Sequence, residues 1–230
     1  MNYEPSAMNL SIVTTADGSK TIYNPEVGEH YHSRHGALQE SRHVFLAAGL
    51  QHYFEGTAAT EVSILEVGLG TGLNFLLTAD YCNNNKIKLN YTGIEAYPLT
   101  EEMISQTGYE QYVPIDIWKS FLKNYTESIN NTVELNSYVQ LRTDNTQLLN
   151  FTSEELFDVV YFDAFAAVHQ PEMWDEAAIG HTIRFLKPGG VFVTYAITGN
   201  LKRMLKALGL KVEKAPGAPG KREMLRAVLS

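Results

Sequence analysis

The sequence predicts an α/β fold built on a mostly parallel, doubly wound sheet. From Glu61 onward, short β-rich runs alternate with helical stretches, as in parallel strands joined by helices. Several runs are almost continuously apolar, as expected for strands buried on both faces. The last two runs are separated only by APGAPGK, which leaves no room for a helix, so they should pair antiparallel as a terminal hairpin. The expected strands are VSILEVG, NYTGIEA, SYVQLRT, FDVVYFDAF, GVFVTYAI, LKVEKA and REMLRAVL.

The length of 230 residues suits one large domain, or one domain with a small appendage. We expect an N-terminal β-hairpin appendage and a lead-in helix over residues 1–56, followed by the main α/β domain over residues 57–230. The hairpin is predicted where SIVTT and KTIYN flank Asp17 and Gly18, a strong turn signal. Apolar residues at helical spacing over residues 38–50 predict the helix.

Composition excludes several protein classes. A single cysteine, Cys82, leaves no intramolecular disulfide and no multi-cysteine zinc site. No charged and apolar leader opens the sequence, and no apolar stretch reaches the roughly 18 residues of a membrane span. We therefore expect a soluble protein of the reducing cytoplasm that does not enter a membrane.

Charge is unevenly distributed along the chain. The net charge of −8 disfavours a dedicated nucleic-acid binder, because phosphate contacts need basic surface. Residues 202–230, however, hold eight basic and two acidic residues, so this segment carries +6 and the rest of the chain −14. Such a basic end favours a localised anion-binding surface. A solvated final helix and strand would have the same composition.

A glycine-rich loop follows the first strand of the main domain. Gly68, Gly70 and Gly72 permit a tight turn and close approach of a ligand, and the next helix offers unpaired N–H donors at its N-terminus. Dinucleotide-binding folds usually read GxGxxG. The GxGxG spacing behind Glu66 is the form associated with S-adenosyl-L-methionine (SAM), so we predict that Glu66, the glycines and Asn74 bind this cofactor. A plain strand-to-helix turn is the alternative.

Three polar residues follow the next two strands of the main domain. Glu95 ends the second strand, where a carboxylate can accept hydrogen bonds from both hydroxyls of a ribose. Asp144 and Asn145 follow the third strand and suit the amine and ring nitrogens of adenine. An Asx turn or a helix cap at these two positions is an equally good interpretation.

Asp163 ends the fourth strand, where cofactor and acceptor should meet, since ligands of open α/β sheets bind beyond the carboxyl ends of central strands. A carboxylate there can position an attacking amine and hold charge as a proton leaves. Phe165 would add an apolar wall. Four histidines lie within residues 30–43 without a compact set of carboxylates, so we expect surface or acceptor-pocket histidines and no metal site.

Seven segments of the sequence together resemble one known family. They are YHSRHGALQESRHVFL, LEVGLGTGLNFL, IEAYPLT, YFDAFAAVHQPEMW, LKPGG, TYAITGNLKRMLKALGL and GKREML. The sequence resembles the SAM-dependent methyltransferases that finish 5-methylaminomethyl-2-thiouridine at the wobble position of tRNA, namely the methyltransferase domain of MnmC and stand-alone MnmD. The resemblance covers almost the whole chain after the hairpin and implies a class I, Rossmann-like methyltransferase fold.

The resemblance also implies roles for individual residues. The three loop glycines would surround the methionyl end of SAM, Glu95 would bind its ribose, Asp144 would face its adenine, and Asp163 would be catalytic. After that aspartate the family usually reads FAPxKxPxMW, whereas this sequence has Ala167 for the proline and His169 for the lysine. The departure affects a contact to RNA or substrate and leaves the cofactor residues intact.

The substrate implied by the resemblance is a 5-aminomethyl uridine in the anticodon region of tRNA. Tyr31 and His169 would join Phe165 in the acceptor pocket. Basic residues of the tail would contact anticodon phosphates, namely Lys202, Arg203, Lys221 and Arg222. The sequence stops directly after KREMLRAVL, so we expect no flavin oxidase domain and methylation alone.

Three other functions share these features. A polyamine-type aminopropyltransferase has the same fold, a small amine acceptor and a SAM-derived donor, but it leaves the KREML segment unexplained. A small-molecule amine methyltransferase fits for the same reasons. A non-catalytic module that binds SAM or RNA also fits, because a fold does not determine an activity.

Overall fold

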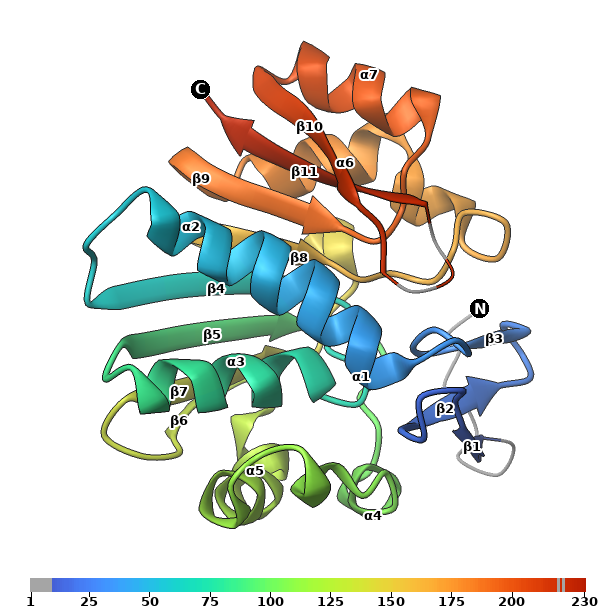
Figure 1. The fold of residues 1–230 in the computed structure, drawn as a ribbon, viewed down its shortest axis with the longest axis vertical. Helices are drawn as coiled ribbons and strands as arrows, with labels where there is room; N and C mark the ends of the chain where they lie inside the picture. Colours follow the sequence, from blue (N-terminus) through green and yellow to red (C-terminus); the bar gives the residue numbers. More distant parts are fainter. Residues whose placement is uncertain (1–9, 219, 221) are drawn as a thin grey trace.

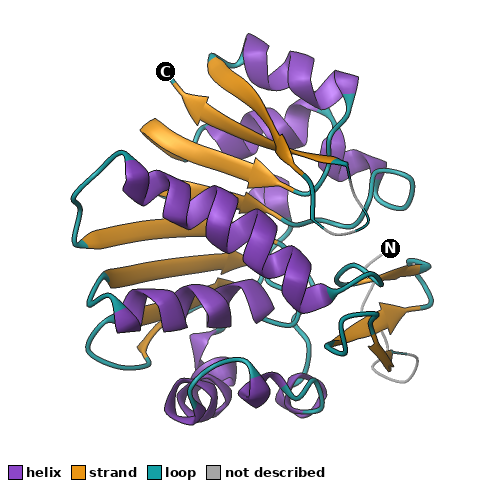
Figure 2. Ribbon diagram, viewed as in Figure 1, coloured by secondary structure: helices purple, strands orange, loops and turns teal. Residues whose placement is uncertain are grey.

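A computed structural model describes residues 10–218, 220 and 222–230 and contains two β-sheets (Figure 1). The large sheet has the strand order β10-β11-β9-β8-β4-β5-β7-β6. Helices cover both of its faces, which confirms the predicted doubly wound arrangement (Figure 2). The strands of this sheet are β4 (Glu61–Val67), β5 (Lys88–Ile94), β6 (Thr132–Glu134), β7 (Val139–Asp144), β8 (Phe157–Phe162), β9 (Leu186–Thr194), β10 (Leu210–Pro216) and β11 (Glu223–Leu229).

The centre of the large sheet is parallel and its edges are antiparallel. β4 pairs with β5 and β8, and these pair outward with β7 and β9, all in parallel. β10 and β11 form an antiparallel pair that joins β9 through β11, so the predicted terminal hairpin is confirmed. The edge strand β6, antiparallel to β7, was not predicted, because three residues are too few to show a strand pattern.

The two faces of the large sheet bury two separate cores. In β4, Ile64 packs with the helices in front of the sheet in Figure 1, and Leu65 packs with those behind it. The front helices are α1 (Ala37–Glu40), the π-helix η1 (Ser41–Gln51), α2 (His52–Glu55), α3 (Leu73–Asn84) and α5 (Ile115–Ser128). The helices behind the sheet are α6 (Glu176–Ile183) and α7 (Gly199–Ala207).

The predicted lead-in helix is confirmed as one continuous helix formed by α1, η1 and α2. Its buried face packs on the sheet, where the rings of Phe45 and Tyr161 lie 5.3 Å apart between centroids. Gly49 allows this close approach, because a Cβ there would lie 2.9 Å from both the Tyr161 ring and Val193. The helix therefore shares the core of the main domain.

The small sheet is the predicted N-terminal hairpin with one added strand. β1 (Ser11–Thr14) and β2 (Lys20–Asn24) pair antiparallel, and β2 also pairs with β3 (Glu29–His30). The side chain of Asp17 stabilises the turn by accepting a hydrogen bond from the N–H of Ser19 at 3.0 Å. The small sheet lies beside the carboxyl edge of the large sheet (Figure 1).

Four short helical segments complete the fold: α4 (Glu101–Ser105), η2 (Tyr109–Gln111), η3 (Leu148–Asn150) and η4 (Pro171–Trp174). Side-chain caps fix where several helices begin. Asp175 accepts a hydrogen bond from the N–H of Ala178 at 2.8 Å before α6, and Thr198 accepts one from Leu201 at 3.1 Å before α7.

Among the described residues, no helix combines the length and the apolar composition needed to cross a membrane.

Candidate functional site

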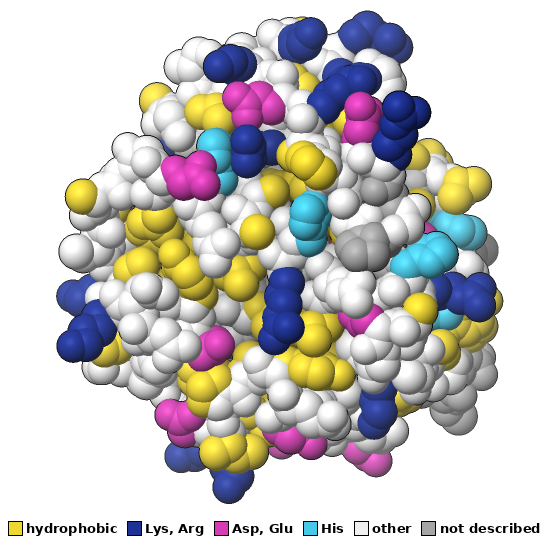
Figure 3. All heavy atoms as spheres, viewed as in Figure 1, with side chains coloured by type: hydrophobic (Ala, Val, Ile, Leu, Met, Phe, Trp, Pro, Cys, Tyr) yellow, Lys and Arg dark blue, Asp and Glu magenta, His cyan; other side chains and the backbone are white. Residues whose placement is uncertain are grey.

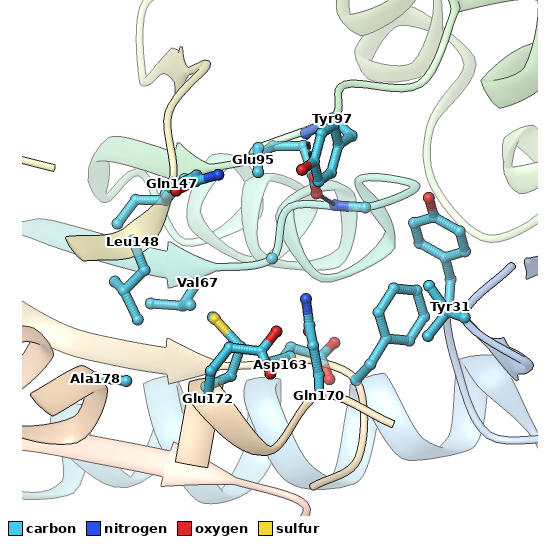
Figure 4. A pocket seen from close by; sticks show the side chains of 18 of the residues that line it. Tyr31, Val67, Glu95, Tyr97, Gln147, Leu148, Asp163, Gln170, Glu172 and Ala178 are labelled. Carbon is cyan, nitrogen blue, oxygen red and sulfur yellow. Dashed lines mark hydrogen bonds between the residues drawn. The ribbon is translucent and has the colours of Figure 1, made fainter. Parts of the chain in front are cut away.

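A cavity of about 320 Å³ opens at the carboxyl edge of the large sheet, next to the small sheet. It lies beyond the ends of β4, β5 and β8, where the sheet topology predicts a ligand. Glu95 and Asp163 lie on opposite sides of it (Figure 4). No lysine or arginine of the described chain lines the cavity, whereas four acidic residues do: Glu95, Asp163, Glu172 and Asp175.

The glycine loop forms part of the cavity wall through Gly68 and Gly70. Both have a positive φ, of 86° and 53°, a conformation that favours glycine. A Cβ on Gly68 would lie 2.5 Å from the carbonyl oxygen of Asp163, and one on Gly70 would lie 2.9 Å from the ring of Tyr31. The loop therefore needs glycine for its shape and for room. Gly72 lies at the start of α3, outside the cavity lining.

The Glu95 carboxylate is held by the backbone around it. Oε2 accepts a hydrogen bond from the N–H of Gly70 at 2.9 Å, and Oε1 accepts one from the N–H of Tyr97 at 3.0 Å. Burial raises the pKa of Glu95, and these donors oppose that shift. A carboxylate oxygen can accept more than one hydrogen bond, so this group suits a ligand with two neighbouring hydroxyls.

Asp163 directly follows β8, and only 7% of its side chain is exposed. Its Oδ2 accepts a hydrogen bond from Nδ2 of Asn74 at 2.8 Å, and the same nitrogen donates to Oε1 of Glu66 at 2.8 Å. The hydroxyl of Tyr91 donates to the other oxygen of Glu66 at 2.7 Å. Burial and the charge of Asp163 raise the pKa of Glu66 well above its ordinary value.

Glu66 and Asn74, both predicted to bind the cofactor, do not line the cavity. Glu66 lies within the buried strand β4 and Asn74 in the first turn of α3, so both side chains sit behind the glycine loop. There they hold Asp163 in place. Neither side chain reaches the cavity wall, so the predicted direct contact with a cofactor is not seen in this cavity.

Asp144 and Asn145, predicted to face adenine, also lie outside the cavity lining. Asp144 accepts hydrogen bonds from Nε of Arg142 at 2.9 and 3.0 Å. Asn145 donates from its side chain to the carbonyl oxygen of Glu95 at 3.1 Å. These two residues shape the loop, while the wall next to them is formed by Thr146, Gln147, Leu148 and Leu149.

Two of the three predicted acceptor-pocket residues line the cavity. Tyr31 and Phe165 meet edge to face, with ring centroids 5.2 Å apart and an interplanar angle of 72°. Burial raises the pKa of Tyr31, so it remains a neutral phenol. His169 is exposed on the loop after β8 and lies outside the lining.

His32 lines the cavity although it was not singled out from the sequence. It is buried; its Nε2 lies 2.8 Å from Oγ1 of Thr71, and its Nδ1 lies 3.8 Å from Oδ2 of Asp163. Burial lowers its pKa to about 4, so the imidazole is neutral at pH 7. The sequence feature that could have pointed to His32 was the cluster of four histidines, of which only His32 lines the cavity.

The described residues contain no group of three or more His, Cys, Asp or Glu placed to hold a metal ion.

The basic tail lies on the surface, outside the cavity lining. Lys202 and Arg203 belong to α7, and Arg222 directly precedes β11. Basic side chains gather over α7 and β10 at the top of Figure 3. Some of the tail's charge is paired within the hairpin, as in the 2.9 Å contact of Arg226 with Glu213. Lys221 lies outside the described residues.

This chain is similar in sequence to one protein family and to several curated proteins. Residues 114–230 match the model of a family described as S-adenosyl-L-methionine-dependent methyltransferase. The chain is 30% identical over 205 residues to the tRNA 5-methylaminomethyl-2-thiouridine biosynthesis bifunctional protein MnmC of Leptospira borgpetersenii, and 30% identical over 243 residues to the protein of that name from Magnetococcus marinus. These alignments cover 85% and 97% of this chain but 31% and 35% of the relatives, so the chain spans about a third of their length.

A solved structure shows the same fold. The crystal structure of MNMC2 from Aquifex aeolicus matches with a TM-score of 0.78 at 24% identity, over 99% of this chain and 73% of that one. A mixed sheet of this kind, flanked by helices and preceded by a small antiparallel sheet, is therefore common to both chains.

The glycine loop gives a test of how closely it packs against Asp163. Gly68→Ala and Gly209→Ala both place a side chain at a φ near +87°, which costs about 1–2 kcal/mol. Only the first also brings a Cβ against backbone, because nothing lies within 4 Å of the Cβ position at Gly209. Urea unfolding should show an extra loss of about 1–3 kcal/mol for Gly68→Ala. Equal losses for the two variants would contradict the close approach.

Proposed function

The chain belongs to the S-adenosyl-L-methionine-dependent methyltransferase family, and we propose that it methylates the amine of 5-aminomethyl-(2-thio)uridine at the wobble position of tRNA. The name of the MnmC relatives supports the product, 5-methylaminomethyl-2-thiouridine. The observation that carries the proposal is the acid-lined cavity with Asp163 at the carboxyl end of β8. The proposal places the substrate in the anticodon region of tRNA and the activity in the cytoplasm.

The residues around the cavity fit SAM. When bound, SAM supplies a methyl group on a positively charged sulfur. A cavity lined by carboxylates, without lysine or arginine among the described lining residues, suits a cation and disfavours the pyrophosphate of a dinucleotide. Glu95 offers oxygens for the ribose hydroxyls, and the positive φ of Gly68 and Gly70 shapes the loop that forms one wall of the cavity. Val67 and Leu148 offer apolar surface for the adenine ring.

Asp163 is the proposed catalytic residue, and it acts on the acceptor amine. A primary alkylamine has a pKa of ~10 and is mostly protonated at neutral pH, so it must lose a proton before its lone pair can react. The Asp163 carboxylate attracts the ammonium group and then accepts a hydrogen bond from the neutral amine, which orients the lone pair. Tyr31 and Phe165 offer flat apolar surface for the uracil ring.

The basic tail is the proposed contact for the phosphates of the anticodon. Lys202, Arg203 and Arg222 lie on the surface, so they would hold the RNA backbone while the wobble base enters the cavity. Lys221 belongs to the same proposal by its place in the sequence. The exposed His169 would lie between the tail that contacts the phosphates and the cavity that takes the wobble base.

SAM should raise the melting temperature of the protein, because a ligand that binds only the folded state stabilises it. Glu95→Gln removes the charge of the ribose-binding group and should weaken SAM binding by about 10- to 100-fold in calorimetric titration. Glu134→Gln, an exposed position on β6, is the control and should leave the affinity unchanged. A larger rise in melting temperature with NAD than with SAM would contradict the assignment of SAM as the cofactor.

Asp163→Asn should lower methylation by about 10²- to 10⁴-fold at saturating SAM, because it keeps the shape but removes the charge that holds the amine. The measurement is mass spectrometry of the wobble nucleoside after incubating the protein with SAM and tRNA that carries 5-aminomethyl-2-thiouridine. Asp158→Asn, near the start of β8 and paired with Lys187, is the control and should keep most of the turnover.

Three outcomes of this experiment would contradict the proposal. Near wild-type turnover by Asp163→Asn would refute the role of the carboxylate. If the unchanged protein left the tRNA unmodified but methylated a free small amine, or transferred an aminopropyl group from a SAM-derived donor, a rival activity would replace the tRNA assignment. If it bound SAM and modified no acceptor, the non-catalytic alternative would stand.

A further inference from the structure

Gln170, on the loop after β8, places a side-chain amide in the cavity wall. It lines the cavity together with Asp163, Tyr31 and Phe165. In the view of Figure 4, its side chain extends into the cavity between those of Asp163 and Tyr31. The residue is half-buried, and its amide makes no hydrogen bond to any residue that the structure describes. A cavity wall with one unused donor and one unused acceptor on the same group suits a polar ligand.

The loop that carries Gln170 is held in shape by its own hydrogen bonds. The N–H of Gln170 donates to the carbonyl oxygen of Ala166 at 2.9 Å. The indole of Trp174 donates to the carbonyl oxygen of Phe165 at 2.7 Å, which joins the two ends of the loop. Pro171 follows Gln170 directly and restricts its backbone. The position of the amide is therefore set before a ligand binds, which lowers the entropy cost of binding.

Two other amide side chains line the cavity within the described chain, and both are placed for other roles. The side-chain oxygen of Asn24 accepts hydrogen bonds from two N–H groups of the turn after β2, at 3.0 and 3.2 Å. Gln147 lies on the side of the cavity that holds Glu95 (Figure 4). Gln170 is thus the amide placed on the side proposed for the acceptor.

The chemistry of the proposed substrate indicates what this amide would meet; the inference therefore rests on the proposed function. The aminomethyl group stands on C5 of uracil. The next ring atom, C4, carries the acceptor O4, and the atom after it, N3, carries a hydrogen. With the amine at Asp163, O4 is the ring acceptor nearest to that carboxylate. A glutamine amide has a donor and an acceptor side by side, as this base edge requires.

We propose that Gln170 binds the O4 and N3 edge of the wobble uracil: its Nε2 donates to O4, and its Oε1 accepts from the N–H of N3. Proteins bind unpaired RNA bases by hydrogen bonds to this edge and by packing against the ring. Tyr31 and Phe165 offer the packing surface. The two hydrogen bonds fix the rotation of the ring and so direct the aminomethyl group toward Asp163. Gln170 makes no contact with the atom on C2.

Gln170→Leu tests the contact, because leucine has a similar size but neither donor nor acceptor. The value of kcat/KM for an anticodon stem-loop that carries 5-aminomethyluridine should fall about 10- to 100-fold. The Kd for SAM in calorimetric titration should stay unchanged. Gln111→Leu, exposed on η2 and outside the cavity lining, is the control and should keep the full kcat/KM. A full kcat/KM in Gln170→Leu, or a matching loss of SAM affinity, would overturn the proposal.

A substrate changed at N3 tests the same contact from the other side. A stem-loop that carries 5-aminomethyl-3-methyluridine lacks the hydrogen on N3, so the unchanged protein should methylate it about 10- to 100-fold less efficiently. Gln170→Ala removes the amide and leaves room for the extra methyl group. In that variant the same substrate change should cost at most about 3-fold, because two changes to one contact are not additive. Equal costs in the two proteins would overturn the proposal.

The atom on C2 gives a further check. The loss in Gln170→Leu should be the same, within about 3-fold, for stem-loops that carry 5-aminomethyluridine and 5-aminomethyl-2-thiouridine. A loss confined to the 2-thio substrate would place the amide at C2 and overturn the proposed edge.

The order of the measurements separates this inference from the function beneath it. The unchanged protein is assayed first, with SAM and tRNA that carries 5-aminomethyl-2-thiouridine. Failure to methylate this tRNA would overturn the proposed function and the contact of Gln170 with it. Normal methylation by the unchanged protein, together with a full kcat/KM in Gln170→Leu, would overturn the contact alone.

Discussion

The side-chain amide of Asn74 links two buried carboxylates on neighbouring parallel strands, and the site depends on this link. Its nitrogen lies 2.8 Å from Glu66 of β4 and 2.8 Å from Asp163 after β8. An amide nitrogen carries two hydrogens, so one residue satisfies both groups. Without it, two buried carboxyl groups would face each other away from water and without this shared donor, which is unfavourable. Because Asn74 begins α3, the position of that helix determines the position of Asp163.

The small N-terminal sheet completes the cavity that the large sheet begins. The side chain of Glu29 accepts a hydrogen bond from the N–H of Ala166 at 2.8 Å, which joins β3 to the loop after Asp163. The N–H of His32 donates to the hydroxyl of Thr21 at 3.0 Å, which fixes the segment after β3 to β2. An element that is an appendage in sequence is therefore part of the site. Tyr31 and His32, which both line the cavity, directly follow its last strand, β3.

Local patterns allowed much of the fold and part of the site to be predicted. The order of the strands along the chain and the glycine loop follow from periodicity and turn chemistry, and Glu95 and Asp163 follow from the rule that strand ends bind ligands. The direction of a side chain within a strand buried on both faces is not a local property, so the place of Glu66 behind the loop could not be predicted. Asp144 is held by Arg142 two residues away, an ion pair that competes with a ligand. His32 reaches the cavity only through tertiary packing, since its partner Thr71 is 39 residues away.

The central claim is that this cavity binds SAM through Glu95 and the acceptor amine through Asp163. A crystal structure of the protein with S-adenosylhomocysteine and an anticodon stem-loop that carries 5-aminomethyluridine tests it most directly. The account predicts that the ribose hydroxyls lie within hydrogen-bond distance of the Glu95 carboxylate and that the amine nitrogen lies next to Asp163, with the uracil ring packed against the side chains of Tyr31 and Phe165. A ribose bound away from Glu95, or an amine turned away from Asp163, would contradict it.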